Sequence, residues 1–222
     1  MIRSSFFSKC GALQVLSYFI GTNCLANYCQ QFMDLSGLKG LFPMFLSPPK
    51  FTKRLGMTED SMEEYSISII FSLLRNLKSE YRARITQKFV ENNFVKIDRL
   101  MQLFTKYNDK INLVNAKIDV RLSELVKQSQ SIDQEMDDQF YYDRLDGGLF
   151  TLQIIVCIIF ELFSEQNLNI SMQINNYLSQ RQISTSYLET ILEEYIQHYG
   201  ENDHYQAVED EKNRLCSLLK FI

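Results

Sequence analysis

The chain has 222 residues, of which 45% are hydrophobic and 13% aromatic; this is enough apolar material for a core and excludes an intrinsically disordered protein. Glycine (8) and proline (3) are scarce, which favours helices over a turn-rich β fold. The net charge of −4 excludes a global nucleic-acid-binding signature, although residues 1–57 carry a local net charge of +5.

Cysteine usage and the N-terminal composition bear on the cellular compartment. The five cysteines are an odd number, and the first twenty residues lack the compact apolar run of a secretory signal. We therefore expect reduced thiols in a cytosolic or nuclear protein.

The N-terminal third is expected to form short helices. Ser36 and Gly37 break the helical pattern, and two prolines and a glycine mark a loop over 47–56. The basic residues of that loop are candidates for contact with an acidic partner or RNA, and a merely soluble loop is the simpler interpretation. These residues are Lys50, Lys53 and Arg54. The expected helices cover 5–19, 24–35 and 38–46.

A longer helix is expected to begin after Thr58 and to end near Leu77. Thr58 is a good N-cap, and Glu59 and Asp60 place negative charge at the positive end of the helix dipole. Apolar residues recur at three- and four-residue steps and predict a stripe facing the core. The stripe comprises Ile67, Ile70, Phe71, Leu74 and Leu77, and a further helix is expected over about 80–91.

A long helix is expected from about 93 to 126. Its apolar residues step alternately by three and four, which is a heptad seam: Ile97, Leu100, Phe104, Tyr107, Ile111, Val114 and Ile118. One interpretation is a dimerising coiled coil. The other, which we favour, is a helix packed within its own domain, because Phe104 and Tyr107 are poor seam residues and further apolar residues widen the stripe.

The segment RLDGGLFTLQIIVCIIFELF (144–163) is the most apolar stretch of the chain, and it could be a membrane span, a phosphate-binding loop or a buried helix. Its unbroken apolar part, 149–163, is too short for a span and contains Gln153 and Glu161. Gly147 and Gly148 lack phosphate-loop spacing. We therefore expect a buried helix.

The residues at the start of this segment are expected to have structural roles. The glycines Gly147 and Gly148 indicate a close approach of another element. Arg144 and Asp146 are expected to tie the helix to its neighbours through buried polar contacts, so that loss of Asp146 would destabilise the protein. The preceding residues, 127–138, form a linker or a helix start, and the last expected helices cover about 168–181, 184–199 and 205–220.

No catalytic or metal-binding pattern stands out. The two histidines, His198 and His204, have no ligand partners at zinc spacing, and no nucleophile elbow, P-loop or calcium loop is present. The acidic residues between 133 and 138 are interpreted as a solvated face. We therefore predict a protein that is not an enzyme and has no cofactor or metal site.

Two segments resemble one armadillo repeat. NYCQQFMDLSGLKGLFPMFLSPP (27–49) resembles the first two helices of the repeat, and EEYSISIIFSLLRNLK (63–78) resembles the third. In peptide-binding members an asparagine of the third helix faces the concave groove, and the resemblance places Asn76 there. The alternative for Asn76 is a capping or structural role. Arg75 is expected beside it, and Ser72 stands where those members have a tryptophan.

The order of several longer motifs resembles the C-terminal part of the beta-catenin-like family of armadillo-repeat proteins. The resemblance covers the chain from about residue 12 to its end. The motifs are GLKGLFPMF (37–45), SLLRNL (72–77), KFVENNFVKIDRLMQLFTKY (88–107), FYYDRLDGGLFTLQ (140–153) and KNRLCSLLKF (212–221). It implies an all-α fold: an armadillo-type solenoid end over 1–79, followed by a C-terminal helical cap over 80–222.

The same resemblance implies a nuclear adaptor associated with the spliceosomal nineteen complex, which binds basic segments of splicing factors. It implies no direct sequence-specific binding to nucleic acid and no membrane association. Family members have further repeats before this region, so either the gene model is truncated or the protein has lost its first repeats. Because an uncapped solenoid end exposes apolar surface, the chain alone is expected to self-associate or to be marginally stable. The alternative is a truncated paralogue that acts as a homo-oligomeric helical module through the long helix.

Overall fold

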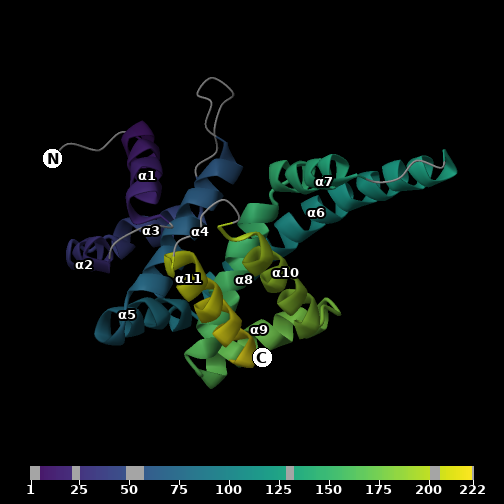
Figure 1. The fold of residues 1–222 in the computed structure, drawn as a ribbon. Coiled ribbons are helices and arrows are strands. Elements are labelled where there is room, and N and C mark those ends of the chain that lie inside the picture. The colour runs from purple at the N-terminus through teal and green to yellow at the C-terminus, as the bar shows by residue number, and fades with distance from the viewer. Residues whose placement is uncertain (1–5, 22–25, 49–57, 129–132, 201–205, 222) are drawn as a thin grey trace.

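The computed structural model describes residues 6–21, 26–48, 58–128, 133–200 and 206–221, and all regular structure in these ranges is helical (Figure 1). The expectation of an all-α fold is confirmed. The helices are α1 (Phe6–Ile20), α2 (Ala26–Asp34), α3 (Leu38–Leu46), α4 (Glu59–Asn76), α5 (Ser79–Val90), α6 (Val95–Lys127), α7 (Gln134–Asp146), α8 (Leu149–Ser164), α9 (Leu168–Gln180), α10 (Thr185–His198) and α11 (Gln206–Leu218), followed by a short 3-10 turn, η1 (Leu219–Phe221).

Helix α4 is the centre of the N-terminal part, and α1, α2 and α3 pack against it. Its start is as expected, because the side-chain oxygen of Thr58 accepts a hydrogen bond from the amide of Ser61 at 3.0 Å. The five residues of the predicted stripe are all buried. The start of α4 and the burial of the stripe are as predicted, but α4 is buried on more than this face, because Ile69 and Leu73 are buried too.

The long helix α6 has two different halves. The first five residues of the heptad seam are buried within the molecule, against α5, α8 and α9. The last two, Val114 and Ile118, are half-buried on the side of α7, which runs beside the second half of α6 as a projecting arm (Figure 1). Packing of this helix within its own domain, the favoured interpretation, is confirmed.

Helix α8 runs through the middle of the C-terminal part and contacts α4, α6, α9, α10 and α11. All but two of its residues are buried, as expected for a core helix. Among the described residues, no single helix is long and apolar enough to cross a membrane; α7 and α8 satisfy length and composition only together, across a 70° bend.

The apolar core does not stop at residue 79, where the sequence suggested a boundary. Helix α4 lies before this position and packs against α8, which lies after it. Buried residues from α1 to α11 belong to one cluster. The helices after residue 79 therefore share one core with the helices before it, and they pack against α4.

Candidate partner-binding site

The residues expected to face a peptide groove lie at the end of α4 and contact the protein itself. Ser72 is buried, and its hydroxyl donates a hydrogen bond to the carbonyl of Gly21 at 3.0 Å. The amide nitrogen of Asn76 donates to the carbonyl of Ser72 at 2.8 Å and also contacts its hydroxyl at 3.2 Å. Partner contact by Ser72 and Asn76 stays a prediction, because their polar atoms already stabilise the end of α4.

Arg75 also has an internal partner. Its Nε atom lies 3.0 Å from a carboxylate oxygen of Glu211, a buried residue of α11. Glu211 in turn pairs with Arg214 on the same helix. Helix α11 therefore contacts the end of α4 through these charges. The remaining candidates, Lys50, Lys53 and Arg54, lie outside the described residues.

The two glycines between α7 and α8 lie against α6, as expected. A β-carbon at Gly147 would stand 2.7 Å from a methyl group of Val114. Gly148 has a φ of +104°, and a β-carbon there would stand 2.9 Å from the ring of Tyr107. These positions let the chain turn by a sharp angle while both helices stay close to α6.

The polar residues before the glycines differ from expectation. Arg144 forms a bidentate ion pair with Glu194 of α10, in which Nη2 lies 3.0 Å from one carboxylate oxygen. Asp146 is exposed, and its side chain makes no hydrogen bond or ion pair to the residues that the structure describes. Asp146 lies at the end of α7 and is exposed, so of these two residues only Arg144 connects α7 to another helix.

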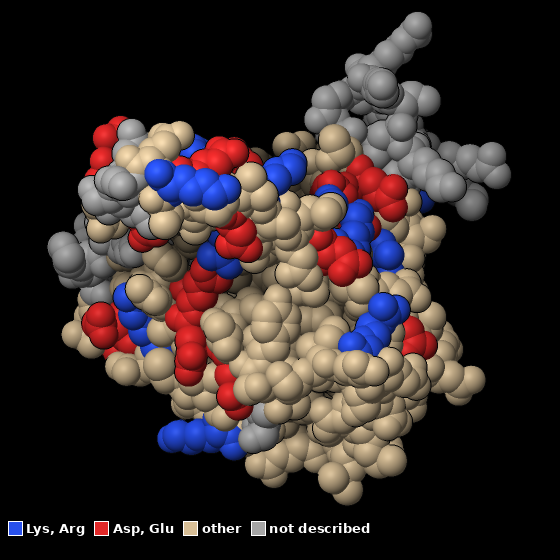
Figure 2. Space-filling view, turned by 90° about the vertical axis from the view of Figure 1, so that its right-hand side faces the viewer, with Lys and Arg blue, Asp and Glu red and all other residues tan. Residues whose placement is uncertain are grey.

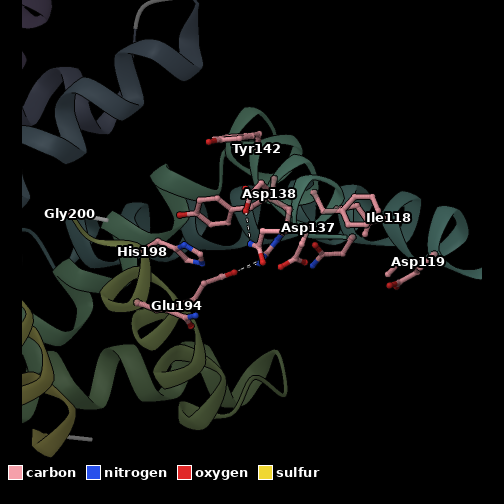
Figure 3. Close-up of a pocket in the computed structure, with 15 residues that line it drawn as sticks. Ile118, Asp119, Asp137, Asp138, Tyr142, Glu194, His198 and Gly200 are labelled. Carbon is pink, nitrogen blue, oxygen red and sulfur yellow. Dashed lines mark hydrogen bonds and ion pairs between the residues drawn. The ribbon is translucent and has the colours of Figure 1, made fainter. Parts of the chain in front are cut away.

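This ion pair lies in a cleft of about 1200 Å³ between the second half of α6, α7 and α10 (Figure 3). Four carboxylate residues line it: Asp119 from α6, Asp137 and Asp138 from α7, and Glu194 from α10. Figure 2, which views the molecule from the side on which α6 and α7 project, shows acidic side chains gathered beside a hollow. The four acids come from three helices, so only the folded chain brings them together.

Aromatic side chains form part of the same wall. The rings of Tyr141 and His198 are stacked with their centroids 4.0 Å apart, and they join α7 to α10. Tyr142, also on α7, is 58% exposed. Phe140 is buried in the middle of α7, with the guanidinium of Arg121 5.4 Å from its ring. An exposed tyrosine beside carboxylates suits a cationic ligand, because an aromatic face attracts cations.

The cleft has an acidic balance. Arg144 is the one lysine or arginine among its described lining residues, against four carboxylates. Asp138 accepts a hydrogen bond from Gln134 at 3.0 Å, an interaction that leaves its charge in place. Such a surface can attract and hold a basic peptide, with aromatic and apolar surface for its side-chain stems.

The cleft is not evident from the sequence. Asp133, Glu135, Asp137 and Asp138 are exposed, as expected for a solvated face, and no local pattern marks Asp119 or Glu194. Asp137 and Asp138 carried the only local signal, since they fall on one helix beside three aromatic residues. The positions of α6 and α10 could not be read from that pattern.

Comparison with known proteins gives one matching family model, described as catenin-beta-like, Arm-motif containing nuclear, over residues 1–193. Beta-catenin-like protein 1 of Bos taurus is 36% identical over 221 residues, and that of Homo sapiens is 35% identical over 221 residues. In both cases the match covers 99% of this chain and 39% of the relative.

A more distant relative matches over a similar region. The beta-catenin-like protein 1 homolog of Schizosaccharomyces pombe is 26% identical over 229 residues, covering 96% of this chain and 36% of the relative. The chain thus spans well under half the length of the curated relatives that it matches.

Proposed function

The chain belongs to the family of catenin-beta-like, Arm-motif containing nuclear proteins, and from that premise we propose that it is a non-catalytic adaptor that binds basic segments of other proteins. The observation that carries this proposal is the acidic cleft between α6, α7 and α10. Armadillo-type proteins are scaffolds whose stacked helices present extended binding surfaces. An adaptor of this kind needs a shaped, charged surface, and the cleft supplies one.

The cellular setting follows from the resemblance of the sequence motifs. The adaptor acts in the nucleus, in assemblies of the nineteen-complex type that take part in pre-mRNA splicing. Its partners are splicing factors that have exposed Lys- and Arg-rich segments. Recovery of splicing factors with the tagged chain from nuclear extract, identified by mass spectrometry, supports this setting, and recovery of none contradicts it.

The binding step is tested with purified protein. A labelled Arg-rich peptide is titrated with the full chain at about 0.1 M and about 1 M salt, between which the screening length falls from ~10 Å to ~3 Å. We expect binding at low salt that weakens strongly at high salt. An acidic peptide of the same length should not bind.

A pair of variants locates the site. Asp137→Asn with Asp138→Asn removes two charges from the cleft and should weaken peptide binding about tenfold, which is ~1.4 kcal/mol. The control is Glu193→Gln with Glu209→Gln, which removes two charges from exposed positions outside the cleft. Equal effects of the two pairs would mean that the peptide responds to net charge only, and the cleft would then not be the site.

A second candidate function is a homo-oligomeric helical module, and one surface favours it. Helix α1 exposes Val15 (56%), Tyr18 (75%) and Phe19 (64%), and Tyr28 of α2 lies next to Phe19 with ring centroids 6.5 Å apart. An exposed apolar patch of this kind marks an interaction surface. The seam of α6 is less suitable, because Ile111 is buried within the fold.

A further inference from the structure

The ion pair between Arg144 and Glu194 occupies the cleft that the adaptor would offer to a basic partner. Both side chains are about three-quarters buried, and both terminal nitrogens of the guanidinium contact the carboxylate. A bidentate arginine–carboxylate contact is a common geometry by which proteins recognise a guanidinium group. The protein thus places one of its own arginines where an incoming arginine would find its best partner.

We propose that Arg144 is an internal stand-in for an arginine of the partner, and that a bound segment displaces it from Glu194. The inference rests on the proposed function and names the ligand group that the cleft selects. In the free protein Arg144 neutralises Glu194, and three carboxylates remain. On binding, the partner's guanidinium takes both oxygens of Glu194, and Arg144 turns outward.

Arg144 is not fully satisfied in its present position. Its Nε atom is buried and has no hydrogen-bond partner among the described residues. A buried donor without a partner is costly, because the group has lost its contact with water. Release of Arg144 toward solvent would rehydrate this N–H group, while Glu194 would exchange one guanidinium for another. The exchange therefore conserves the ion pair and removes an unpaired donor.

The geometry selects arginine over lysine. A lysine ammonium group is a point charge and cannot bind two carboxylate oxygens in one plane as a guanidinium can. The other acids, Asp119, Asp137 and Asp138, attract cations of either kind. Preference for arginine should therefore depend on Glu194, while general attraction to basic segments should depend on the other three.

The test compares Arg144→Gln with Arg121→Gln in the full chain. Each variant removes one positive charge, but Arg121 is exposed, lies against Phe140 and does not line the cleft. We expect Arg144→Gln to bind an Arg-rich peptide about fivefold or more tightly than the wild type, and Arg121→Gln to change binding less than about twofold, because only Arg144 competes for Glu194. Arg144→Lys should give a smaller gain.

Two further measurements keep the inference testable if Arg144→Gln is unstable. Glu194→Gln should abolish the preference for an Arg-rich over a Lys-rich peptide, and adding Arg144→Gln to it should give no further gain beyond that of Arg121→Gln. If no variant and no wild-type protein binds either peptide, the proposed function fails. If the wild type binds but Arg144→Gln binds no better than Arg121→Gln, or Glu194→Gln keeps the arginine preference, only the stand-in role fails.

Discussion

The backbone at Gly148 lies directly against the ring of Tyr107, so that a β-carbon at position 148 would stand 2.9 Å from the ring atom Cδ1. This contact fixes the distance between the start of α8 and the middle of α6. The tyrosine ring is itself held, because its hydroxyl donates a hydrogen bond to the buried carboxylate of Glu63 at 2.9 Å. Neither partner in the contact can easily move away.

Gly148→Ala should therefore destabilise the protein. The left-handed backbone costs an alanine about 1–2 kcal/mol, and overpacking against Tyr107 adds about 1–3 kcal/mol. We expect a loss of about 2–5 kcal/mol in the free energy of unfolding, measured with urea. Gly40→Ala is the control, because nothing lies within 4 Å of its β-carbon position in α3, and it should stabilise by about 0.5–1 kcal/mol. A neutral Gly148→Ala would contradict the close packing.

Glu161→Gln should lower the free energy of unfolding, although it removes a charge from an apolar helix. Its carboxylate is 1% exposed and lies between two arginines, Arg82 of α5 at 2.9 Å and Arg214 of α11. Removing one partner of a buried ion pair costs about 3–5 kcal/mol. Because the two arginines are 19% and 28% exposed and keep other carboxylate partners, we expect about 2–3 kcal/mol here.

The comparison variant for Glu161→Gln is Lys88→Gln, because Glu91 also lies 3.7 Å from the buried Lys96 and keeps its charge in this variant. Glu91 pairs with Lys88 at 2.8 Å, but both side chains are 37% exposed. A pair of this kind contributes less than about 1 kcal/mol. Urea unfolding of both variants measures the difference, and similar losses would mean that the buried network around Glu161 adds no stability beyond an ordinary surface pair.

These contacts mark the limit of what could be predicted from the sequence. The cap at Thr58, the stripe on α4 and the burial of α8 follow from patterns a few residues long, and each is confirmed. The partners of Glu161 lie 79 and 53 positions away along the chain. No local pattern specifies which arginine approaches which carboxylate. The cleft could not be predicted for the same reason, since its walls come from three helices.

Asp146 illustrates the same limit and gives a prediction. Its place beside Arg144 and two glycines suggested a buried polar contact, but the side chain is exposed, and Arg144 pairs with Glu194 instead. Asp146→Ala should therefore change the free energy of unfolding by less than about 0.5 kcal/mol, as surface substitutions usually do. A thermal melt compares it with Glu194→Gln, and a larger loss for Asp146→Ala would restore the sequence-based interpretation.

Glu64 and Asp60 should respond to pH in opposite directions. Burial raises the pKa of Glu64 above its usual value of 4.5, and a hydrogen bond from Thr151 at 3.5 Å offsets this only partly. The folded state thus binds this proton more tightly than the unfolded state, so the contribution of Glu64 to stability is fully present below the unfolded pKa and is lost as pH rises through the folded pKa. Glu64→Gln removes this loss and should stabilise by less than about 1 kcal/mol at pH 7.

The matched variant for Glu64→Gln is Asp60→Asn. Burial raises the pKa of Asp60, but hydrogen bonds from Lys106 and Lys110 outweigh it, and the net pKa is lowered. Its stabilising contribution is present above the unfolded pKa and is lost as pH falls through the folded pKa. Asp60→Asn should therefore be less stable than the wild type at pH 7 and should approach it in acid. Urea titrations across this range measure both variants, and shifts of the same sign would contradict the assignment.

The exposed face of α1 should cause the chain to associate with itself. Tyr18 and Phe19 are 75% and 64% exposed, and the ring of Phe19 lies next to that of Tyr28, so covering them removes apolar surface from water. We expect sedimentation velocity to show a mass that rises with protein concentration, and Phe19→Glu to return the protein to a monomer. Leu168→Glu, at a 78% exposed position on α9, is the control and should leave association unchanged. Wild-type protein that stays monomeric at every concentration would contradict the homo-oligomeric function. If both variants abolish association equally, the exposed face of α1 is not the specific interface.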